Sequence, residues 1–399
     1  MNDISSIKLP TPIKWSSKKA AASKHITKEL EAVLKKAPNE RNYIGALAEV
    51  CAETSSLRSA TSSYWLPYLY AESSLSDFFE AWLEYTPSPS APGQYIEYWD
   101  YLVNTKSGLL LANDDHFKVW FRKFLDFHGD FINSTDSVST LSEWMAYGGT
   151  PEHPFDINDY QVPKGGFKSF NQFFLRNLKK DQRPLCAASN DASIIAPCDG
   201  GIFYLDRGGN AEEAREKQHD LPGKYDQFGL LDALPGYGEY FLGGPLMDIL
   251  LWFTDYHHFH APVSGKVIHQ GLYRGSYNYD FGDYDPEDLY APDLSADSDR
   301  VGWYHKLGKH QRYVWIIKTE DLGLVAMIAI GFWGVGSITN AIKPNAEVEK
   351  GQYMGHFNYG GSSIVLAFHP GLDINFRVGY QPVQDADHPV LMKVRQCLG

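Results

Sequence analysis

The segment from Gly355 to Val365 reads Gly-His-Phe-Asn-Tyr-Gly-Gly-Ser-Ser-Ile-Val, so two glycines and two serines stand at the start of an apolar run. That run, over 363–368, is typical of a buried β-strand. Other short runs of β-branched or aromatic residues, separated by Gly and Asp, occur after residue 155, at 193–196, 201–205, 266–270 and 313–318. The C-terminal part of the chain is therefore predicted to be rich in β-strands.

The region before residue 148 has a helical pattern instead. Apolar residues recur at the spacing of one helix face, at Ile26, Leu30, Val33, Leu34 and Ala37. Helices are also predicted over 43–51, 75–85, 95–104 and 115–131, and the aromatic residues of the last segment indicate a packed core rather than a cofactor pocket. The sequence thus predicts an α+β protein with a polar tail at 1–25, a helical N-terminal domain at 26–147, a linker at 148–160 and a β-rich domain at 161–399.

Charge and cysteine content exclude several classes of protein. The 399 residues include 36 Lys and Arg against 49 Asp and Glu, a net charge of −13 with neutral histidines. This argues against nucleic-acid binding and against stable docking on an anionic membrane surface, since both rely on clusters of basic residues. The four cysteines lie far apart with no CxxC pair, so neither a disulfide framework nor a structural zinc site is expected. The first fifteen residues lack the apolar core of a secretory signal, and we expect a cytoplasmic protein.

Two further segments need an interpretation. The stretch 322–342 has no charged residue and is long enough to span a bilayer, but its glycines and polar residues favour two buried strands joined by a Gly-rich bend. The acidic stretch 280–299 starts like a calcium loop at Asp283, Asp285 and Glu287. It lacks the Gly at position six and the Glu at position twelve that such a loop needs, so a solvated surface insertion is the preferred interpretation.

Three histidines within four positions, His257, His258 and His260, form the densest cluster of chemically useful side chains. Their spacing alone leaves three alternatives open: a metal site, acid–base chemistry, or ordinary packed histidines. The Gly-Gly-Ser-Ser turn at 360–363 is neither a nucleophile elbow nor a P-loop. Asp199, one of the histidines and Ser362 could supply a carboxylate, a base and a nucleophile, although a plain turn is the simpler alternative.

Four ordered motifs resemble the phosphatidylserine decarboxylase family. The segment 256–265, Tyr-His-His-Phe-His-Ala-Pro-Val-Ser-Gly, is similar to that family's Tyr-His-Arg-x-His-x-Pro-x-x-Gly motif, and 360–363 is similar to its Gly-Ser cleavage site. The segments 170–184 and 196–201 complete the four motifs, and 331–338 and 348–355 resemble the strands before the family's cleavage site. The resemblance covers about 165–380 and implies a β-rich decarboxylase domain at 161–399.

The resemblance implies a proenzyme that cleaves itself between Gly361 and Ser362. Asp199, His260 and Ser362 would form the triad, with His260 as the base and Asp199 orienting it. Ser362 would become a covalent pyruvoyl group, which forms a Schiff base with the substrate amine and accepts electrons as CO₂ leaves. His257 would be the acid that reprotonates the substrate, and His258, where the family usually has Arg, would have no chemical role. The chains 1–361 and 362–399 would stay together without a covalent bond, and no metal is implied.

The substrate is predicted from the N-terminal domain. The segment 115–137 resembles an extra domain of family members that decarboxylate free aromatic amino acids such as tryptophan. We therefore expect a free L-amino acid, with phosphatidylserine as the alternative. A different class of alternative is a non-catalytic binding protein on a biotinyl- or lipoyl-like β scaffold. The expected partners are the small-molecule substrate and the chain's own cleavage product, with no nucleic acid and no stable membrane insertion, and a homo-oligomer is left open.

Overall fold

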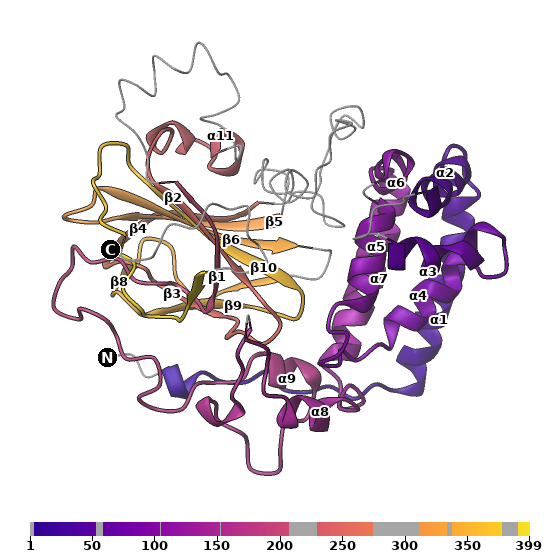
Figure 1. Ribbon diagram of the computed structural model, residues 1–399, viewed down its shortest axis with the longest axis horizontal. Helices are drawn as coiled ribbons and strands as arrows, with labels where there is room; N and C mark the ends of the chain where they lie inside the picture. Colours follow the sequence, from indigo (N-terminus) through magenta and orange to yellow (C-terminus); the bar gives the residue numbers. More distant parts are fainter. Residues whose placement is uncertain are drawn as a thin grey trace.

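The structure is a computed structural model that describes residues 4–52, 59–103, 105–151, 153–206, 230–273, 311–332, 337–376 and 390–399. Most helices gather on one side of the molecule and the strands on the other (Figure 1). The predicted α+β class is therefore confirmed.

The helical side is built from amphipathic and aromatic-rich helices with regular caps. Asp114, for example, caps α7 by accepting hydrogen bonds from the backbone N–H groups of His116 and Phe117. The helices are α1 (Ser17–Leu34), α2 (Asn39–Ala52), α3 (Ser59–Leu69), α4 (Leu75–Leu83), α5 (Gln94–Val103), α6 (Lys106–Ala112), α7 (Asp115–Ile132), α8 (Leu141–Ala146), α9 (Phe170–Phe174) and α11 (Leu230–Ala233), with short 3-10 turns at Ile4–Ser6, Ile157–Asp159 and Gly238–Tyr240. The four further helices predicted from the sequence correspond to α2, α4, α5 and α7.

The strands of the described residues form an eight-stranded antiparallel sheet and a three-stranded one. The order in the large sheet is β11-β1-β2-β10-β6-β5-β4-β8, and in the small sheet β3-β9-β7. The bounds are β1 (Gly200–Asp206), β2 (Leu246–Leu251), β3 (His258–His260), β4 (Gly265–Tyr273), β5 (Gln311–Lys318), β6 (Leu324–Phe332), β7 (Ile338–Asn340), β8 (Glu347–Val348), β9 (Tyr353–Phe357), β10 (Gly361–Phe368) and β11 (Val390–Met392). The Gly-Gly-Ser-Ser segment thus opens an interior strand, β10, which pairs with β2 and β6.

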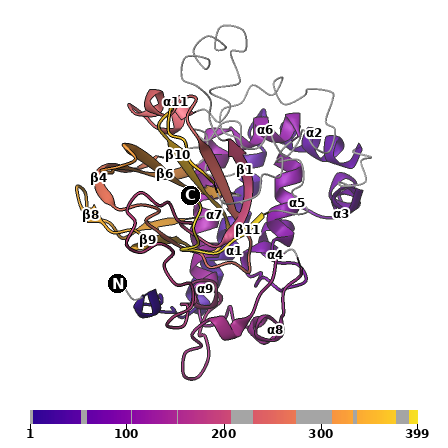
Figure 2. The ribbon, with the colours of Figure 1, turned by 60° about the vertical axis from the view of Figure 1, so that its left-hand side comes forward.

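The pleat of β10 sends alternate side chains to opposite faces of the large sheet. Ile364 and Leu366 pack in the core that faces the small sheet, whereas Val365 and Ala367 pack in the core beneath α11. By the same alternation Ser362 faces the first core and Ser363 the second. Figure 2 shows the sheet edge-on, with α11 on one side and β9 on the other.

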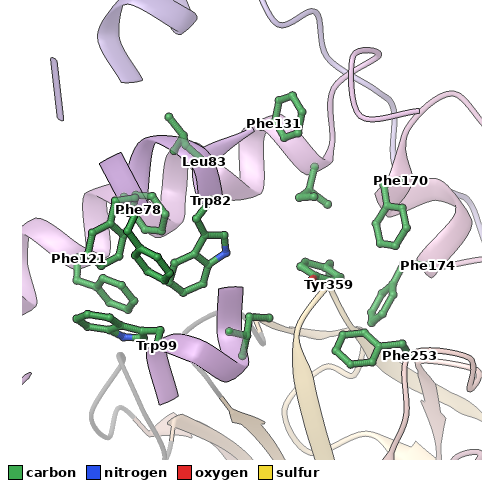
Figure 3. Close-up of a cluster of buried hydrophobic side chains, with 14 of the residues drawn as sticks. Phe78, Trp82, Leu83, Trp99, Phe121, Phe131, Phe170, Phe174, Phe253 and Tyr359 are labelled. Atoms are coloured by element: carbon green, nitrogen blue, oxygen red, sulfur yellow. The ribbon is translucent and has the colours of Figure 1, made fainter. Parts of the chain in front are cut away.

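The helical part shares one hydrophobic core with loops of the β-rich part, whereas the large sheet has two cores of its own. The shared core runs from Ile4 through Leu178 and also takes in Phe253 and Tyr359 of the β-rich part. Figure 3 shows Tyr359 and Phe253 beside Phe170 and Phe174. The predicted linker at 148–160 belongs to the same core, because it contributes two buried aromatic residues, Phe155 and Tyr160.

Two local expectations also differ from the structure. Residues 17–25, assigned to a polar tail, form the first turns of α1, because Ser16 caps the helix and residues such as Ser23 are buried on it. The expected strand at 193–196 is reduced to a single bridge between Ile195 and Cys397. Its isoleucines are buried as predicted, but burial alone does not distinguish a strand from a packed loop.

The stretch 322–342 contains two strands as predicted, of which β6 is buried and β7 is partly exposed. No helix in the described part of the chain is long and apolar enough to cross a membrane. The acidic stretch 280–299 lies outside the described residues.

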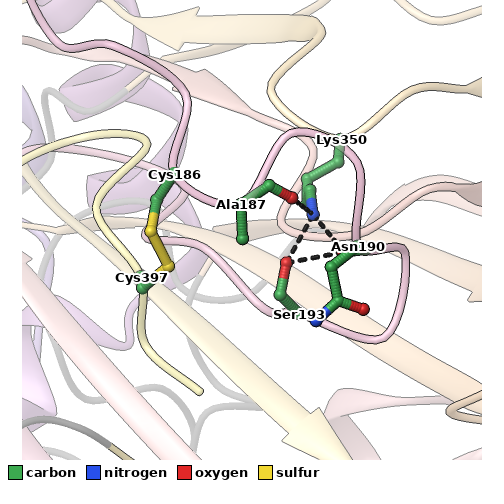
Figure 4. The surroundings of a disulfide bond; sticks show 6 residues. All are labelled: Cys186, Ala187, Asn190, Ser193, Lys350 and Cys397. Atoms are coloured by element: carbon green, nitrogen blue, oxygen red, sulfur yellow. Dashed lines mark hydrogen bonds between the residues drawn. A yellow bond between two sulfur atoms is a disulfide. The ribbon is translucent and has the colours of Figure 1, made fainter.

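A disulfide between Cys186 and Cys397 contradicts the expectation that the cysteines stay unpaired. The two residues are 211 positions apart, and their Cα atoms lie 5.4 Å from each other. Backbone pairing at Ile195 and Cys397, and the hydrogen bond from Cys186 N to Arg395 O, bring the two segments together. Figure 4 shows the bond between the two sulfur atoms, next to the loop that carries Ala187 and Asn190. Spacing in the sequence could not reveal this pairing, since it depends on how the last residues fold back on the 186–196 loop.

Candidate active site

Ser362 is fully buried near the start of β10 and faces a histidine. Its Oγ lies 3.3 Å from Nδ1 of His257, which comes from the turn just before β3. On the neighbouring strands it stands opposite Leu251 and Gly331. Gly360, which precedes the Gly361–Ser362 peptide, has φ +146°, a conformation that favours glycine. The uncleaved peptide therefore enters the sheet beside a potential base.

The hydrogen bonds of His257 fix its tautomer. Nε2 lies 3.0 Å from the carbonyl oxygen of Trp252, and a carbonyl can only accept, so Nε2 carries the proton and Nδ1 is an acceptor. The Ser362 hydroxyl is therefore the donor to Nδ1. Burial, together with the positive charge of Arg176, holds the pKa of His257 well below its usual value, which keeps the ring neutral. The ring of Phe174 stacks on it at 3.8 Å between centroids.

His260, the base implied by the resemblance, has other partners. Nδ1 donates to the carbonyl oxygen of Gly351 at 3.1 Å, and Nε2 lies 3.4 Å from the hydroxyl of Tyr256. Burial and the charge of Arg395 lower its pKa to about 3, and the charge of Asp199 offsets only part of this. Both ring nitrogens are thus engaged by partners other than Ser362, and the ring lies beside that of Tyr256.

Asp199 is buried beside two cations rather than hydrogen-bonded to His260. Its carboxylate accepts a hydrogen bond from Val394 N at 2.8 Å, and lies 3.3 Å from both Arg183 Nη2 and Lys393 Nζ. Burial by itself would raise the pKa of Asp199, but the charges of Lys393 and Arg183 bring it below its usual value. Asp199 therefore links Arg183 to the C-terminal residues Lys393 and Val394.

His258 is also buried and lies apart from Ser362. Its Nε2 bonds to the carbonyl oxygen of Leu175 at 2.9 Å. Within the described residues, no group of three His, Cys, Asp or Glu side chains is arranged to hold a metal ion.

Sequence reasoning missed the residues that position His257. Trp252, Phe174 and Arg176 hold or polarise its ring, and they come from the end of β2 and from the region of α9. It also missed a cavity of about 320 Å³ whose wall includes Gly331, opposite Ser362, and Tyr359, together with residues of α7. Only the pattern Phe173-Phe-Leu-Arg176, part of the segment 170–184, gave a signal for any of these residues.

The family model for phosphatidylserine decarboxylase matches residues 170–388, more than half of the chain. The chain belongs to the phosphatidylserine decarboxylase family. This membership confirms the resemblance drawn from the four motifs and makes the chain a decarboxylase, a carboxy-lyase.

Some curated relatives are named for phosphatidylserine, and others are decarboxylases whose names do not mention a lipid. The chain is 27% identical over 300 residues to decarboxylase iboD of Amanita muscaria, covering 69% of this chain and 83% of that protein. It is 28% identical over 220 residues to phosphatidylserine decarboxylase proenzyme 3 of Schizosaccharomyces pombe, covering 54% of this chain but only 20% of that protein. It is 23% identical over 292 residues to L-tryptophan decarboxylase of Psilocybe cubensis, covering 66% of this chain and 65% of the relative.

Proposed function

We propose that this decarboxylase cleaves itself, carries a pyruvoyl group derived from Ser362, and removes the α-carboxylate of a free L-amino acid with an aromatic side chain, such as tryptophan. The observation that carries the proposal is the buried contact between the Ser362 hydroxyl and Nδ1 of neutral His257. The word proenzyme in the names of relatives supports self-cleavage. Relatives named for amino-acid decarboxylation support the substrate class.

The cleavage chemistry follows from the residues at the start of β10. Ser362 Oγ gives its proton to a histidine and attacks the carbonyl carbon of Gly361, so the amide becomes an ester. Elimination then breaks the bond between Cβ and Oγ of residue 362, which releases the carboxylate of Gly361 and leaves a dehydroalanine. Water converts that group to the pyruvoyl cap and ammonia. The products are chains 1–361 and 362–399.

The surroundings of Ser362 fit a pyruvoyl group. The residue opposite it on β6, Gly331, borders the cavity and has no side chain that could fill the space beside residue 362. A pyruvoyl carbonyl supplies the electrophile and the electron sink that decarboxylation of an amine-bearing substrate needs. His257 would hold or deliver a proton there, since its Nδ1 already lies at the position of the reacting atoms.

The identity of the base for self-cleavage is part of the proposal. The resemblance assigns it to His260, oriented by Asp199, whereas the hydrogen bonds of the uncleaved chain favour His257. We propose His257 as the residue that accepts the Ser362 proton. His260 and Asp199 then support the site by anchoring the segments that carry Gly351 and Val394.

Phosphatidylserine is the second candidate substrate, because several relatives are named for it. The cavity favours the smaller substrate, since about 320 Å³ is at the low end for small-molecule sites. A non-catalytic role has no support in a site that keeps a buried serine against a histidine of the correct tautomer.

Gel electrophoresis and intact mass of the purified protein test self-cleavage. With reductant we expect chains 1–361 and 362–399, the shorter one with a blocked N-terminus that reacts with carbonyl reagents. Without reductant the two should migrate together, because the disulfide joins Cys186 of one to Cys397 of the other. This corrects the expectation of a purely non-covalent pair. A full-length chain without carbonyl reactivity would contradict the proposal.

Decarboxylation assays with tryptophan, other L-amino acids and phosphatidylserine vesicles decide the substrate. We expect CO₂ release from free aromatic amino acids, and release from the lipid alone would establish the second candidate. The cytoplasmic location stays a prediction, and the Cys186–Cys397 disulfide weighs against it, because such bonds are rare in reducing compartments.

A further inference from the structure

The cavity next to Ser362 lies between the helical part and the ends of the sheet. Its wall includes residues of α7, from Arg122 to Asn133, on one side and Asn171, Asn358 and Tyr359 on the other. Its wall also includes Gly331, which pairs with Ser362, so the cavity lies one strand away from the reacting residue. Any molecule that reacts at residue 362 and extends into this cavity contacts the helical part of the chain.

Three hydrogen-bond acceptors at this cavity have no donor among the described residues. They are Nε2 of His128, Oδ1 of Asn171 and Oδ1 of Asn133. His128 is 0% exposed and Asn171 is 6% exposed, so solvent does not readily satisfy them. Buried polar atoms in native proteins are nearly always paired, so three unpaired acceptors around one cavity indicate a ligand with donors.

The neighbouring hydrogen bonds define these atoms as acceptors. Nδ1 of His128 lies 3.2 Å from the carbonyl oxygen of Leu83 and must donate to it, which leaves Nε2 without a proton. Burial lowers the pKa of His128 to about 4, so the ring is neutral near pH 7. Asn171 Nδ2 donates to Asn358 Oδ1 at 3.1 Å, which leaves Oδ1 of Asn171 as the unpaired atom.

We propose that this cavity holds the side chain of the substrate and selects side chains that end in an N–H or O–H donor over isosteres that lack one. The proposal rests on the function proposed above, with the substrate amine at residue 362 and its side chain directed towards α7. An indole N–H or a phenol O–H would satisfy His128 or Asn171, whereas a purely apolar ring would leave both acceptors unpaired. His128 and Asn171 are thus the specificity-determining residues.

Matched substrates test the proposal on the processed enzyme. We compare L-tryptophan with its benzothienyl analogue, in which sulfur replaces the N–H, and tyrosine with phenylalanine. The wild type should prefer the donor-bearing partner by about tenfold to a hundredfold in kcat/KM. His128→Phe and Asn171→Leu should each bring that ratio towards one by lowering only the rate for the donor-bearing substrate.

Asn113→Leu is the matched control, because Asn113 also has an unpaired Oδ1 in the helical part but does not border the cavity. It should leave the ratio unchanged. Equal rates for both partners in the wild type would overturn the proposal. So would an equal loss for all substrates in His128→Phe and Asn171→Leu, since that would assign the acceptors to the common α-ammonium group.

Binding to the uncleaved Ser362→Ala chain separates this proposal from the proposed function. The cavity is already present in the uncleaved chain, so calorimetry should show tighter binding of tryptophan than of its benzothienyl analogue, again by about tenfold or more. Equal binding, or none, overturns the specificity proposal. A wild type that fails to cleave or to release CO₂ counts against the proposed function, and the calorimetry then still decides the role of the cavity.

Discussion

Ser362 and Ser363 are neighbours in the sequence and equally buried, yet they lie in different surroundings. Ser362 faces the small sheet and donates its hydroxyl to a neutral His257. Ser363 faces the core beneath α11, and so does Asp248 of β2, which pairs with Val365. Burial raises the pKa of Asp248 to about 7, with a partial offset from the Ser363 hydroxyl.

The difference shows that the pleat of one strand can place two adjacent serines beside different proton acceptors. A serine needs an adjacent base that is unprotonated at the working pH. His257 meets this condition through burial and through the Trp252 carbonyl, which fixes its tautomer. Asp248 holds a proton on part of the molecules at pH 7, and in that form it cannot accept the Ser363 proton.

Replacing the two serines one at a time gives the largest expected effect. Ser362→Ala should abolish self-cleavage, because no hydroxyl remains beside the Gly361 carbonyl, whereas Ser363→Ala should still produce both chains. A reducing gel and intact mass distinguish the outcomes, and the two variants are matched in burial and size. If Ser363→Ala stays full length and Ser362→Ala is cleaved, Ser363 and not Ser362 is the residue that attacks the chain.

The fold was predictable where local pattern and burial agree. The apolar run after Ser362 became β10, and the aromatic stripe of 115–131 became the buried face of α7. The first turns of α1 carry few large apolar residues, so periodicity could not reveal them. The pairing of Ile195 and Cys186 with the last residues joins segments about 200 positions apart, which no local pattern can indicate.

The site was predictable in its residue types but not in its hydrogen bonds. Gly-Gly-Ser-Ser and the histidine cluster identified Ser362, His257 and His260 as candidates. The contact of His257 with Ser362 depends on the pairing of β10 and on the Trp252 carbonyl, and both arise only when the chain folds. His128 and Asn171 lie in the segments 115–137 and 170–184, whose family resemblance assigns no role to either residue, so only the folded cavity could single them out.

A second prediction compares the two histidines and sharpens the comparison of the two faces. His257→Ala should slow self-cleavage by about 10²- to 10⁴-fold, the usual contribution of a general base, because Ser362 loses its acceptor. His260→Ala should be cleaved faster than His257→Ala, since its nitrogens bond to Gly351 and Tyr256. The time course of cleavage after rapid synthesis measures both, with thermal melts as a control for folding. The opposite order would return the role of base to His260, as the family resemblance implies, and leave His257 to turnover.

The smallest effect concerns Asp248 and depends on pH. Its pKa of about 7 in the folded chain lies above the usual 3.8, so the folded state binds the proton more tightly than the unfolded state does. The contribution of this proton to the free energy of unfolding is fully present below about pH 4 and is lost as the pH rises to about 7. Its full loss corresponds to at most about 4 kcal/mol.

Asp248→Asn is neutral at every pH and should avoid that loss. In the uncleaved Ser362→Ala background, its free energy of unfolding in urea should rise relative to the parent chain between pH 5 and pH 8. Asp136→Asn, at an exposed carboxylate, should show no such trend. A gain from Asp248→Asn that is the same at both pH values would mean that Asp248 is not protonated in the fold. Ser363 would then face an ionised carboxylate that can accept a proton. The protonation state of Asp248 would no longer distinguish Ser363 from Ser362, whose neighbour His257 is also unprotonated at Nδ1.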